Sequence, residues 1–134
     1  MISYSYTLQP PGEIIIKETG DKIVSEFIQG NSFKIFSPKE AYLDVRGLKF
    51  PLIIRNRKEG DKFHPLGAKG EKKLKDFFID RKIPLRERNF IPLVLSGNEI
   101  VWVAGVEINH RYRVREDTSQ MLHLLLQKGQ NKEL

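Results

Sequence analysis

The sequence contains no cysteine, which excludes disulfide bonds, thiolate metal sites and cysteine nucleophiles. It also has no apolar run close to the roughly 20 residues that a membrane-spanning helix requires. The first six residues have neither the charged segment nor the apolar segment of a signal peptide. We therefore expect a cytoplasmic protein without a membrane partner.

Motifs that bind nucleotides or metals are missing as well. The segment Gly67-x-x-Gly70 followed by Lys72-Lys73 does not have the spacing of a P-loop, and no Gly-x-Gly-x-x-Gly occurs. The histidines are far apart in the sequence, and none has a partner at metal-ligand spacing: His64, His110 and His123. Asp61 follows a glycine near His64, which is typical of a turn residue that bonds its own backbone. We predict no catalytic residue, no cofactor-binding residue and no metal site.

The excess positive charge lies in one stretch of the chain. Residues 55–88 contain twelve Lys or Arg and six Asp or Glu, a balance of +6 that equals that of all 134 residues. The rest of the chain holds eleven basic and eleven acidic side chains. A basic patch on a neutral body predicts a polyanionic partner, although uneven surface charge alone is the simpler alternative.

Length and pattern predict one α+β domain over residues 1–127, with a polar tail at 128–134. Residues 1–50 form its strand-rich N-terminal part, and 51–127 its core with a loop, a helix and a hairpin. Short apolar and β-branched stretches between turn signals predict strands at 14–16, 23–28, 33–35, 41–45, 50–55, 92–95, 100–104, 112–114 and 121–126. The turn Ser96-Gly97-Asn98 predicts a hairpin, and Trp102, within an apolar run, is predicted to be a core residue.

A long loop and one main helix are predicted in the middle of the chain. Residues 57–71 are rich in glycine and charge, which is typical of a shaped, functional loop. Leu74, Phe77 and Phe78 have i, i+3, i+4 spacing and predict a helix over about 71–82, which Pro84 ends. One further turn is predicted over 86–90.

Lys72 and Lys73 would lie in the first turn of that helix, where a cation opposes the helix dipole. An anion bound there would gain backbone donors and two ammonium groups. Gly67 and Gly70 would let the backbone approach a phosphate. The alternative is a solvated flank with Lys72 and Asp76 as a weak ion pair. We favour phosphate binding, because that pair needs only one of the two lysines.

This part of the chain also carries a long motif: Arg57-x-x-Gly60-Asp61-x-Phe63-x-Pro65-Leu66-Gly67-x-x-Gly70-x-Lys72-Lys73-Leu74-Lys75-Asp76-Phe77-Phe78-Ile79-Asp80-x-Lys82-Ile83-Pro84. Downstream follow Arg88, Pro92-Leu93-Val94 and Ile100-Val101-Trp102-Val103-Ala104-Gly105. Over roughly residues 52–114 the chain resembles the C-terminal domain of bacterial tRNA(Ile)-lysidine synthetase. Glu107 departs from the pattern, since many members have a basic residue there, and this weakens the strand after Gly105 as an RNA face.

The resemblance implies a layered β/β/α fold, similar to a domain of the phenylalanine-tRNA synthetase β subunit. It implies a parent ligase of tRNA processing that joins lysine to the wobble cytidine of tRNA(Ile) and uses ATP in an N-terminal catalytic domain. That domain carries Ser-Gly-Gly-x-Asp-Ser, which does not occur in this sequence. The resemblance therefore implies a non-catalytic, tRNA-binding domain that docks the acceptor stem. Its implied partners are tRNA and the catalytic domain, and a homodimer through sheet edges stays open.

Charge and resemblance together select the RNA-binding candidates: Arg57, Lys69, Lys72, Lys73, Lys75, Lys82 and Arg88. Lysines act as point charges on phosphates, whereas an arginine can bind a phosphate through two parallel hydrogen bonds. Two alternatives remain. One is an interdomain or protein–protein module without RNA contact. The other is an independent small enzyme, which the absence of a triad, metal set or paired carboxylates disfavours.

Overall fold

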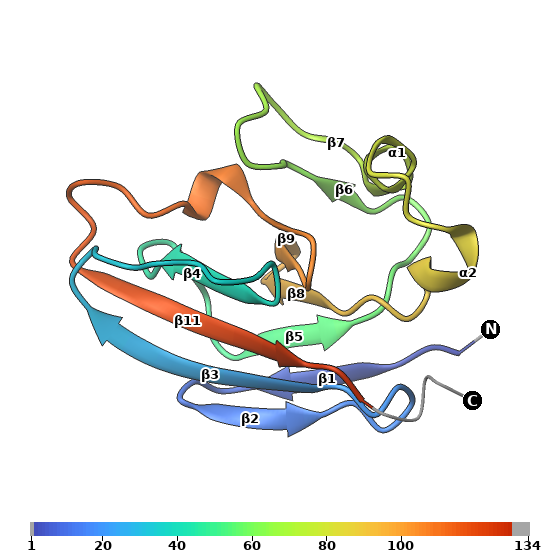
Figure 1. The fold of residues 1–134 in the computed structure, drawn as a ribbon, viewed down its shortest axis with the longest axis horizontal. Helices are drawn as coiled ribbons and strands as arrows, with labels where there is room; N and C mark the ends of the chain where they lie inside the picture. Colours follow the sequence, from blue (N-terminus) through green and yellow to red (C-terminus); the bar gives the residue numbers. More distant parts are fainter. Residues whose placement is uncertain (1, 130–134) are drawn as a thin grey trace.

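The computed structural model describes residues 2–129 and shows two large antiparallel β-sheets and a small helical layer (Figure 1). The five-stranded sheet has the order β1 (Ser5–Leu8), β5 (Leu52–Arg55), β8 (Leu93–Ser96), β9 (Glu99–Val103) and β10 (Glu107–Ile108). The four-stranded sheet has the order β2 (Gly12–Ile15), β3 (Lys22–Gln29), β11 (Gln120–Gln127) and β4 (Glu40–Asp44). A two-stranded pair, β6 (Lys62–Phe63) and β7 (Lys72–Lys73), precedes α1 (Leu74–Asp80) and α2 (Leu85–Arg88). A 3₁₀ helix, η1 (His110–Tyr112), follows β10.

The main core lies between the two larger sheets. On β11, Leu122, Leu124 and Leu126 are buried, while the alternate residues His123 and Leu125 are half-buried on the outer face. This alternation follows from the period of two in a strand, which turns every second side chain toward the facing sheet. Trp102 of β9 belongs to this core and is 1% exposed, which confirms its predicted core position.

A second core lies on the opposite face of the five-stranded sheet. Leu93 and Leu95 of β8 pack there with the apolar side chains of α1, whereas the intervening Val94 belongs to the main core. Because β8 is covered on both faces, its sequence is continuously apolar. The layers therefore follow one another as sheet, sheet and helix, and Figure 1 shows α1, α2 and the β6–β7 pair on one side. This arrangement confirms the predicted α+β class and its β/β/α layering.

Most of the predicted strands are present. The structure has strands at or next to the positions predicted at 14–16, 23–28, 41–45, 50–55, 92–95, 100–104 and 121–126. The β8–β9 hairpin is confirmed, with Gly97 in its turn at φ 59°. The further turn predicted over 86–90 is present as α2. Among residues 2–129, no helix is long and apolar enough to cross a membrane.

Two strand predictions were wrong. Phe33 and Ile35 lie outside any strand, in the exposed segment between β3 and β4. Residues 112–114 contain the end of η1, because Asn109 caps this turn by accepting a hydrogen bond from the Arg111 N–H at 2.8 Å. Sequence patterns also missed β1 and the short strands β6 and β7, whereas the strand expected after Gly105 is present as β10.

The main helix is shorter than predicted at both ends. Lys72 and Lys73 pair with β6 instead of entering the helix, so α1 begins at Leu74. At the other end, the Ile83 N–H donates to the Phe78 carbonyl and the Lys82 N–H donates to the Ile79 carbonyl, both at 3.0 Å. This is a Schellman motif, and it ends the helix before Pro84 is reached.

Candidate nucleic-acid interface

The β6–β7 pair is fixed at its base by a half-buried ion pair. Arg55 at the end of β5 binds both carboxylate oxygens of Asp61, at 2.9 and 3.0 Å, and each side chain is 12% exposed. Asp61 also accepts from the Lys58 N–H at 2.7 Å, as expected for a turn residue. Its own carbonyl accepts from the Leu74 N–H at 2.9 Å, where α1 begins. Asp61 therefore links the turn, the strand pair and the helix.

Two histidines hold the loop between β6 and β7. The rings of His64 and His110 stack with centroids 5.0 Å apart, and the Gly67 N–H donates to Nδ1 of His110 at 3.0 Å. Partial burial, together with Arg113 and His64, lowers the pKa of His110 below its ordinary value, and an accepting Nδ1 requires the neutral ring. Within residues 2–129 no group of His, Asp or Glu is placed to hold a metal ion. These histidines thus have a structural role.

The loop does not form the predicted phosphate cradle. The Gly67 N–H is used by His110, and the Ala68 N–H donates to the Pro65 carbonyl at 3.0 Å. Lys72 lies in β7 and forms an ion pair with Asp80, so it is not in the first turn of α1. The expected pair with Asp76 does not form. The predicted placement of Lys72 and Lys73 in the first turn of the helix is therefore wrong.

The helix α1 attaches this region to the second core. Phe77 and Phe78 are 2% and 0% exposed, and the ring of Phe77 meets that of Phe63 edge-on at 5.0 Å. On its other side, the guanidinium of Arg81 lies 4.9 Å from the Phe77 ring centroid. Arg81 also pairs with Glu107 of β10 at 2.9 Å. Glu107, where the resemblance predicts a basic residue, thus forms an ion pair with the C-cap residue of α1.

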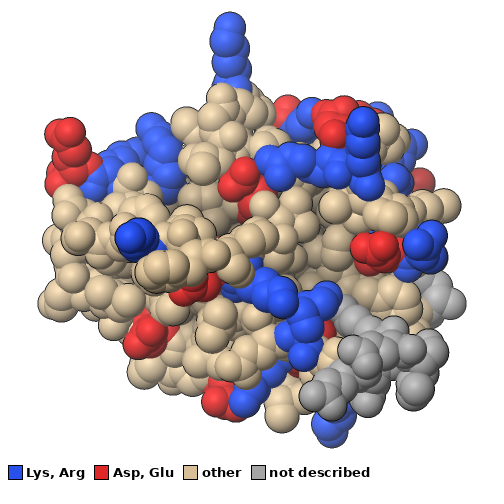
Figure 2. Space-filling model, in the orientation of Figure 1, with Lys and Arg blue, Asp and Glu red and all other residues tan. Residues whose placement is uncertain are grey.

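Four of the predicted lysines are exposed and form no ion pair within residues 2–129: Lys69, Lys73, Lys75 and Lys82. Lys69 lies in the loop between β6 and β7, and the other three lie on α1 or at its ends. Lys82 has φ 56°, a left-handed conformation at the helix C-terminus where glycine is the usual residue. Figure 2 shows Lys and Arg side chains gathered over this corner, with a few acidic side chains among them. We call these four side chains together with Lys62 the basic surface.

Lys62 was missed from the sequence. It stands directly opposite Lys73 in the register of β6 and β7, and both side chains are exposed. Like charges at facing positions of an antiparallel pair are destabilising. Sequence reasoning missed it because this pairing joins two segments across a loop and leaves no local periodicity. Arg86 on α2 is exposed and was also not selected.

The two predicted arginines are half-buried. Nε of Arg57 donates to the side-chain oxygen of Asn89 at 2.8 Å, and Nε of Arg88 donates to the Ile83 carbonyl at 3.0 Å. Their Nη groups have no hydrogen bond to the described part of the chain. These bonds orient both guanidinium groups around α2 and leave the Nη pair of each for a ligand.

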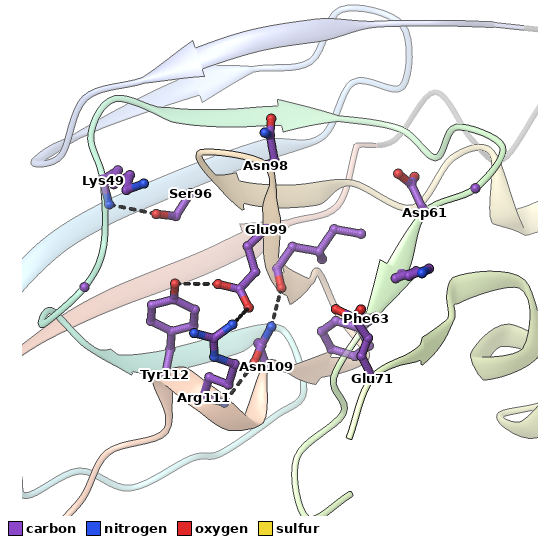
Figure 3. A pocket seen from close by; sticks show the side chains of 14 residues that line it. Lys49, Asp61, Phe63, Glu71, Ser96, Asn98, Glu99, Asn109, Arg111 and Tyr112 are labelled. Carbon is purple, nitrogen blue, oxygen red and sulfur yellow. Dashed lines mark hydrogen bonds and ion pairs between the residues drawn. The ribbon is translucent and has the colours of Figure 1, made fainter. Parts of the chain in front are cut away.

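A polar pocket of about 540 Å³ lies beside the basic surface (Figure 3). Its walls come from η1, the tip of the β8–β9 hairpin and the base of the β6–β7 pair. Glu99 accepts from Arg111 at 2.8 Å and from the Tyr112 hydroxyl at 2.6 Å. Burial, followed by the hydrogen bond to Glu99, raises the pKa of Tyr112 to about 12. Hydrogen bonds from Arg111 and Tyr112 to Glu99 therefore fix the side chains of one wall of the pocket.

Comparison with known proteins identifies the family of the chain. A model of the TilS substrate C-terminal domain matches residues 52–124. The tRNA(Ile)-lysidine synthase of Caldanaerobacter subterraneus is 43% identical over 99 residues, which are 74% of this chain and 20% of that protein. The enzyme of Symbiobacterium thermophilum is 33% identical over 119 residues, which are 88% of this chain and 25% of that protein. The chain thus spans about a fifth to a quarter of these relatives.

Solved structures show the same fold. A crystal structure of a TilS C-terminal domain superimposes with a TM-score of 0.79 at 29% identity, covering 95% of this chain and 98% of that one. An N-terminal fragment of the phenylalanyl-tRNA synthetase β-subunit from Pyrococcus horikoshii gives a TM-score of 0.57 at 21% identity. It covers 65% of this chain and 27% of that one, and this likeness concerns the fold alone. The predicted similarity to that subunit is thereby confirmed.

Proposed function

The chain belongs to the TilS substrate C-terminal domain family, and on this basis we propose that it binds the acceptor stem of tRNA for a tRNA(Ile)-lysidine synthase. In this proposal the parent enzyme attaches lysine to the wobble cytidine of tRNA(Ile). The reaction and its ATP belong to a catalytic domain, which is the second partner of this chain. The chain contributes affinity and placement of the RNA.

The observation that supports RNA binding most directly is the pair of facing lysines on β6 and β7. Lys62 and Lys73 are exposed, opposed and without an ion pair inside residues 2–129. Such a pair of like charges destabilises the isolated fold. A polyanion placed across the two strands turns that repulsion into attraction. Lys82 supports the same interpretation, because a lysine occupies a backbone position that favours glycine.

The chemistry of the surface suits A-form RNA. Double-stranded RNA is recognised mostly by shape, through contacts to phosphates and 2′-hydroxyl groups. The exposed lysines supply point charges for phosphates. Arg57 and Arg88 each use only Nε within the described chain. The two Nη groups of each arginine can therefore donate two parallel hydrogen bonds to a phosphate.

The test is the salt dependence of tRNA binding in a double variant, Lys73→Gln with Lys75→Gln. Each phosphate contact contributes about 0.9 units to the slope of log K against log salt for a duplex, so the variant should lose about two units. The matched control is Lys17→Gln with Lys39→Gln, which removes two exposed lysines outside residues 55–88 and should leave the slope unchanged. An acceptor-stem hairpin should bind like the whole tRNA, and an anticodon hairpin more weakly. A wild-type slope in the first variant would refute the assignment of this surface.

One observation favours a second function, docking on another protein domain without RNA contact. Phe33, Ile35 and Phe36 are 43%, 50% and 79% exposed in the segment between β3 and β4. Phe33 stacks on Tyr42 of β4 with centroids 4.8 Å apart, so this apolar segment is anchored to the four-stranded sheet. The segment lies outside the basic surface. If RNA binding fails its test, the catalytic domain is the partner to try next, with Phe36→Ser as the variant.

We further propose that the chain itself uses no cofactor. The Gly67 N–H already donates to His110 and the Ala68 N–H to the Pro65 carbonyl, whereas a phosphate-binding loop would keep such donors free. The purified chain should therefore neither hydrolyse ATP nor form lysidine. ATP turnover by the pure chain, retained after a second purification step, would contradict this.

A further inference from the structure

The pocket beside η1 carries an imbalance of charge that the fold does not resolve. Two of its acidic side chains are neutralised, because Glu99 pairs with Arg111 and Asp61 pairs with Arg55. The charged lining residues left are Lys49, Lys62 and Glu71, none of which has an ion pair with residues 2–129. The unpaired lining is therefore positive, and it favours an anionic ligand.

The shape and polarity of the pocket select the class of that anion. The aromatic rings at its wall offer little face for stacking, since Tyr112 is 9% exposed and Phe63 is 1% exposed. The polar groups are placed around the cavity, with Lys49 and Ser96 toward one end and Glu71 toward the other (Figure 3). A ligand with one charged end and several hydroxyl groups fits this lining better than a flat base does.

The available donors and acceptors match a sugar phosphate. The side-chain oxygen of Ser96 accepts from the Lys49 N–H at 2.7 Å, which leaves the hydroxyl proton for a ligand. Asn98 at the hairpin tip is exposed and offers both an amide donor and a carbonyl acceptor. Glu71 offers a carboxylate for hydroxyl groups. Lys49 supplies charge for a phosphate, and the volume of about 540 Å³ accommodates a single nucleotide unit.

We propose that this pocket binds a ribose phosphate unit, with Lys49 at its phosphate and Asn98 and Glu71 at its hydroxyl groups. Lys62 also belongs to the basic surface, so the pocket opens where the proposed RNA backbone passes. Identification of RNA as the source rests on the proposed function. A free nucleotide has the same chemistry, and the experiment separates the two sources.

The experiment is a ¹H–¹⁵N NMR titration of the 134-residue chain with ribose 5-phosphate. Ribose and inorganic phosphate, the two halves of this ligand, are titrated separately. Ribose 5-phosphate should shift the amides of Ser96 to Glu99 and of η1 in a saturable way, with a dissociation constant on the order of 1 mM. Each half alone should bind more weakly. Lys49→Gln should weaken binding about tenfold, as loss of one charged hydrogen bond does.

Lys39→Gln is the matched control. Lys39 is an exposed lysine just before β4 and does not line the pocket, whereas Lys49, which follows the turn after β4, does. An unchanged spectrum outside the pocket shows that each variant is folded. If ribose 5-phosphate produces no saturable shift up to about 10 mM, or if Lys49→Gln binds it like wild type, the pocket assignment is overturned.

The source follows from competition. An acceptor-stem hairpin should displace ribose 5-phosphate, and an anticodon hairpin should displace it less well. If neither hairpin displaces ribose 5-phosphate, the pocket is assigned to a free nucleotide. Because Lys73→Gln with Lys75→Gln leaves the pocket lining intact, loss of RNA binding with retained sugar-phosphate binding would refute only the proposed function.

Discussion

Lys82 offers a test in which stability and function should move in opposite directions. It sits at the first position beyond the α1 C-cap with φ 56°, and its N–H and that of Ile83 close the Schellman motif. Glycine is the usual residue at this position, because a side chain in the left-handed region meets the backbone. The variant Lys82→Gly should therefore fold more stably and bind RNA less well.

The size of each effect follows from the geometry. Relief of the left-handed conformation contributes about 1–2 kcal/mol. The additional freedom of glycine in the unfolded chain costs about 0.5–1 kcal/mol. The free energy of unfolding should rise by about 0.75 kcal/mol, the middle of a range of about 0–1.5 kcal/mol, which raises the thermal midpoint by about 2–4 °C. Loss of one phosphate contact should reduce the salt slope of tRNA binding by about 0.9 units.

Urea unfolding and tRNA titrations at several salt concentrations measure both quantities on the same variant. Lys82→Arg is the control, since it keeps the charge and the backbone conformation and should change neither. A wild-type salt slope for Lys82→Gly would remove Lys82 from the interface. A fall in stability would refute the argument that its backbone conformation is strained.

Three further results are expected. Phe77→Ala should lower the free energy of unfolding by about 3–5 kcal/mol in urea titrations, because the ring is 2% exposed; an unchanged midpoint would show that α1 is not anchored there. The pKa of His110 is lowered, so its contribution to stability is present above the ordinary value of 6.5 and is lost as the pH falls below it. The Gly67 amide signal should therefore titrate with a midpoint under 6.5, and a midpoint above this value would contradict the accepting Nδ1. Burial opposes charge on Asp44, but hydrogen bonds from Arg46 and Thr118 outweigh it and hold its pKa at about 2. Its contribution to stability is thus present above 3.8 and is lost as the pH falls toward 2, so Asp44→Asn should flatten acid unfolding in that range.

Local pattern was sufficient for the features that depend on neighbouring residues. The apolar stripe of Leu74, Phe77 and Phe78 is the face by which α1 meets the second core, as its i, i+3, i+4 spacing predicts. The continuous apolar run at 92–95 indicates a central strand because β8 is covered on both faces. The confinement of net charge to residues 55–88 is a property of the sequence alone. It indicates a polyanionic partner before any contact is known.

Features that depend on distant residues could not be predicted in this way. Lys72 and Lys73 have good helical spacing to the apolar stripe, yet their strand pairing with Lys62 and Phe63 removes them from the helix. That pairing brings Lys62 opposite Lys73, and it leaves Lys72 to pair with Asp80 across α1.

The pocket also depends on residues that are distant in the sequence. Lys49, Glu71 and Asn98 come from three separate turns, and they line one cavity only because the sheets and the β6–β7 pair pack as they do. Sequence thus determined how much charge this protein carries and which helix face is apolar, since both are set within a few residues. Tertiary structure decided which of those charges are neutralised and which remain available, because each ion pair depends on a partner that only the packed fold brings within reach.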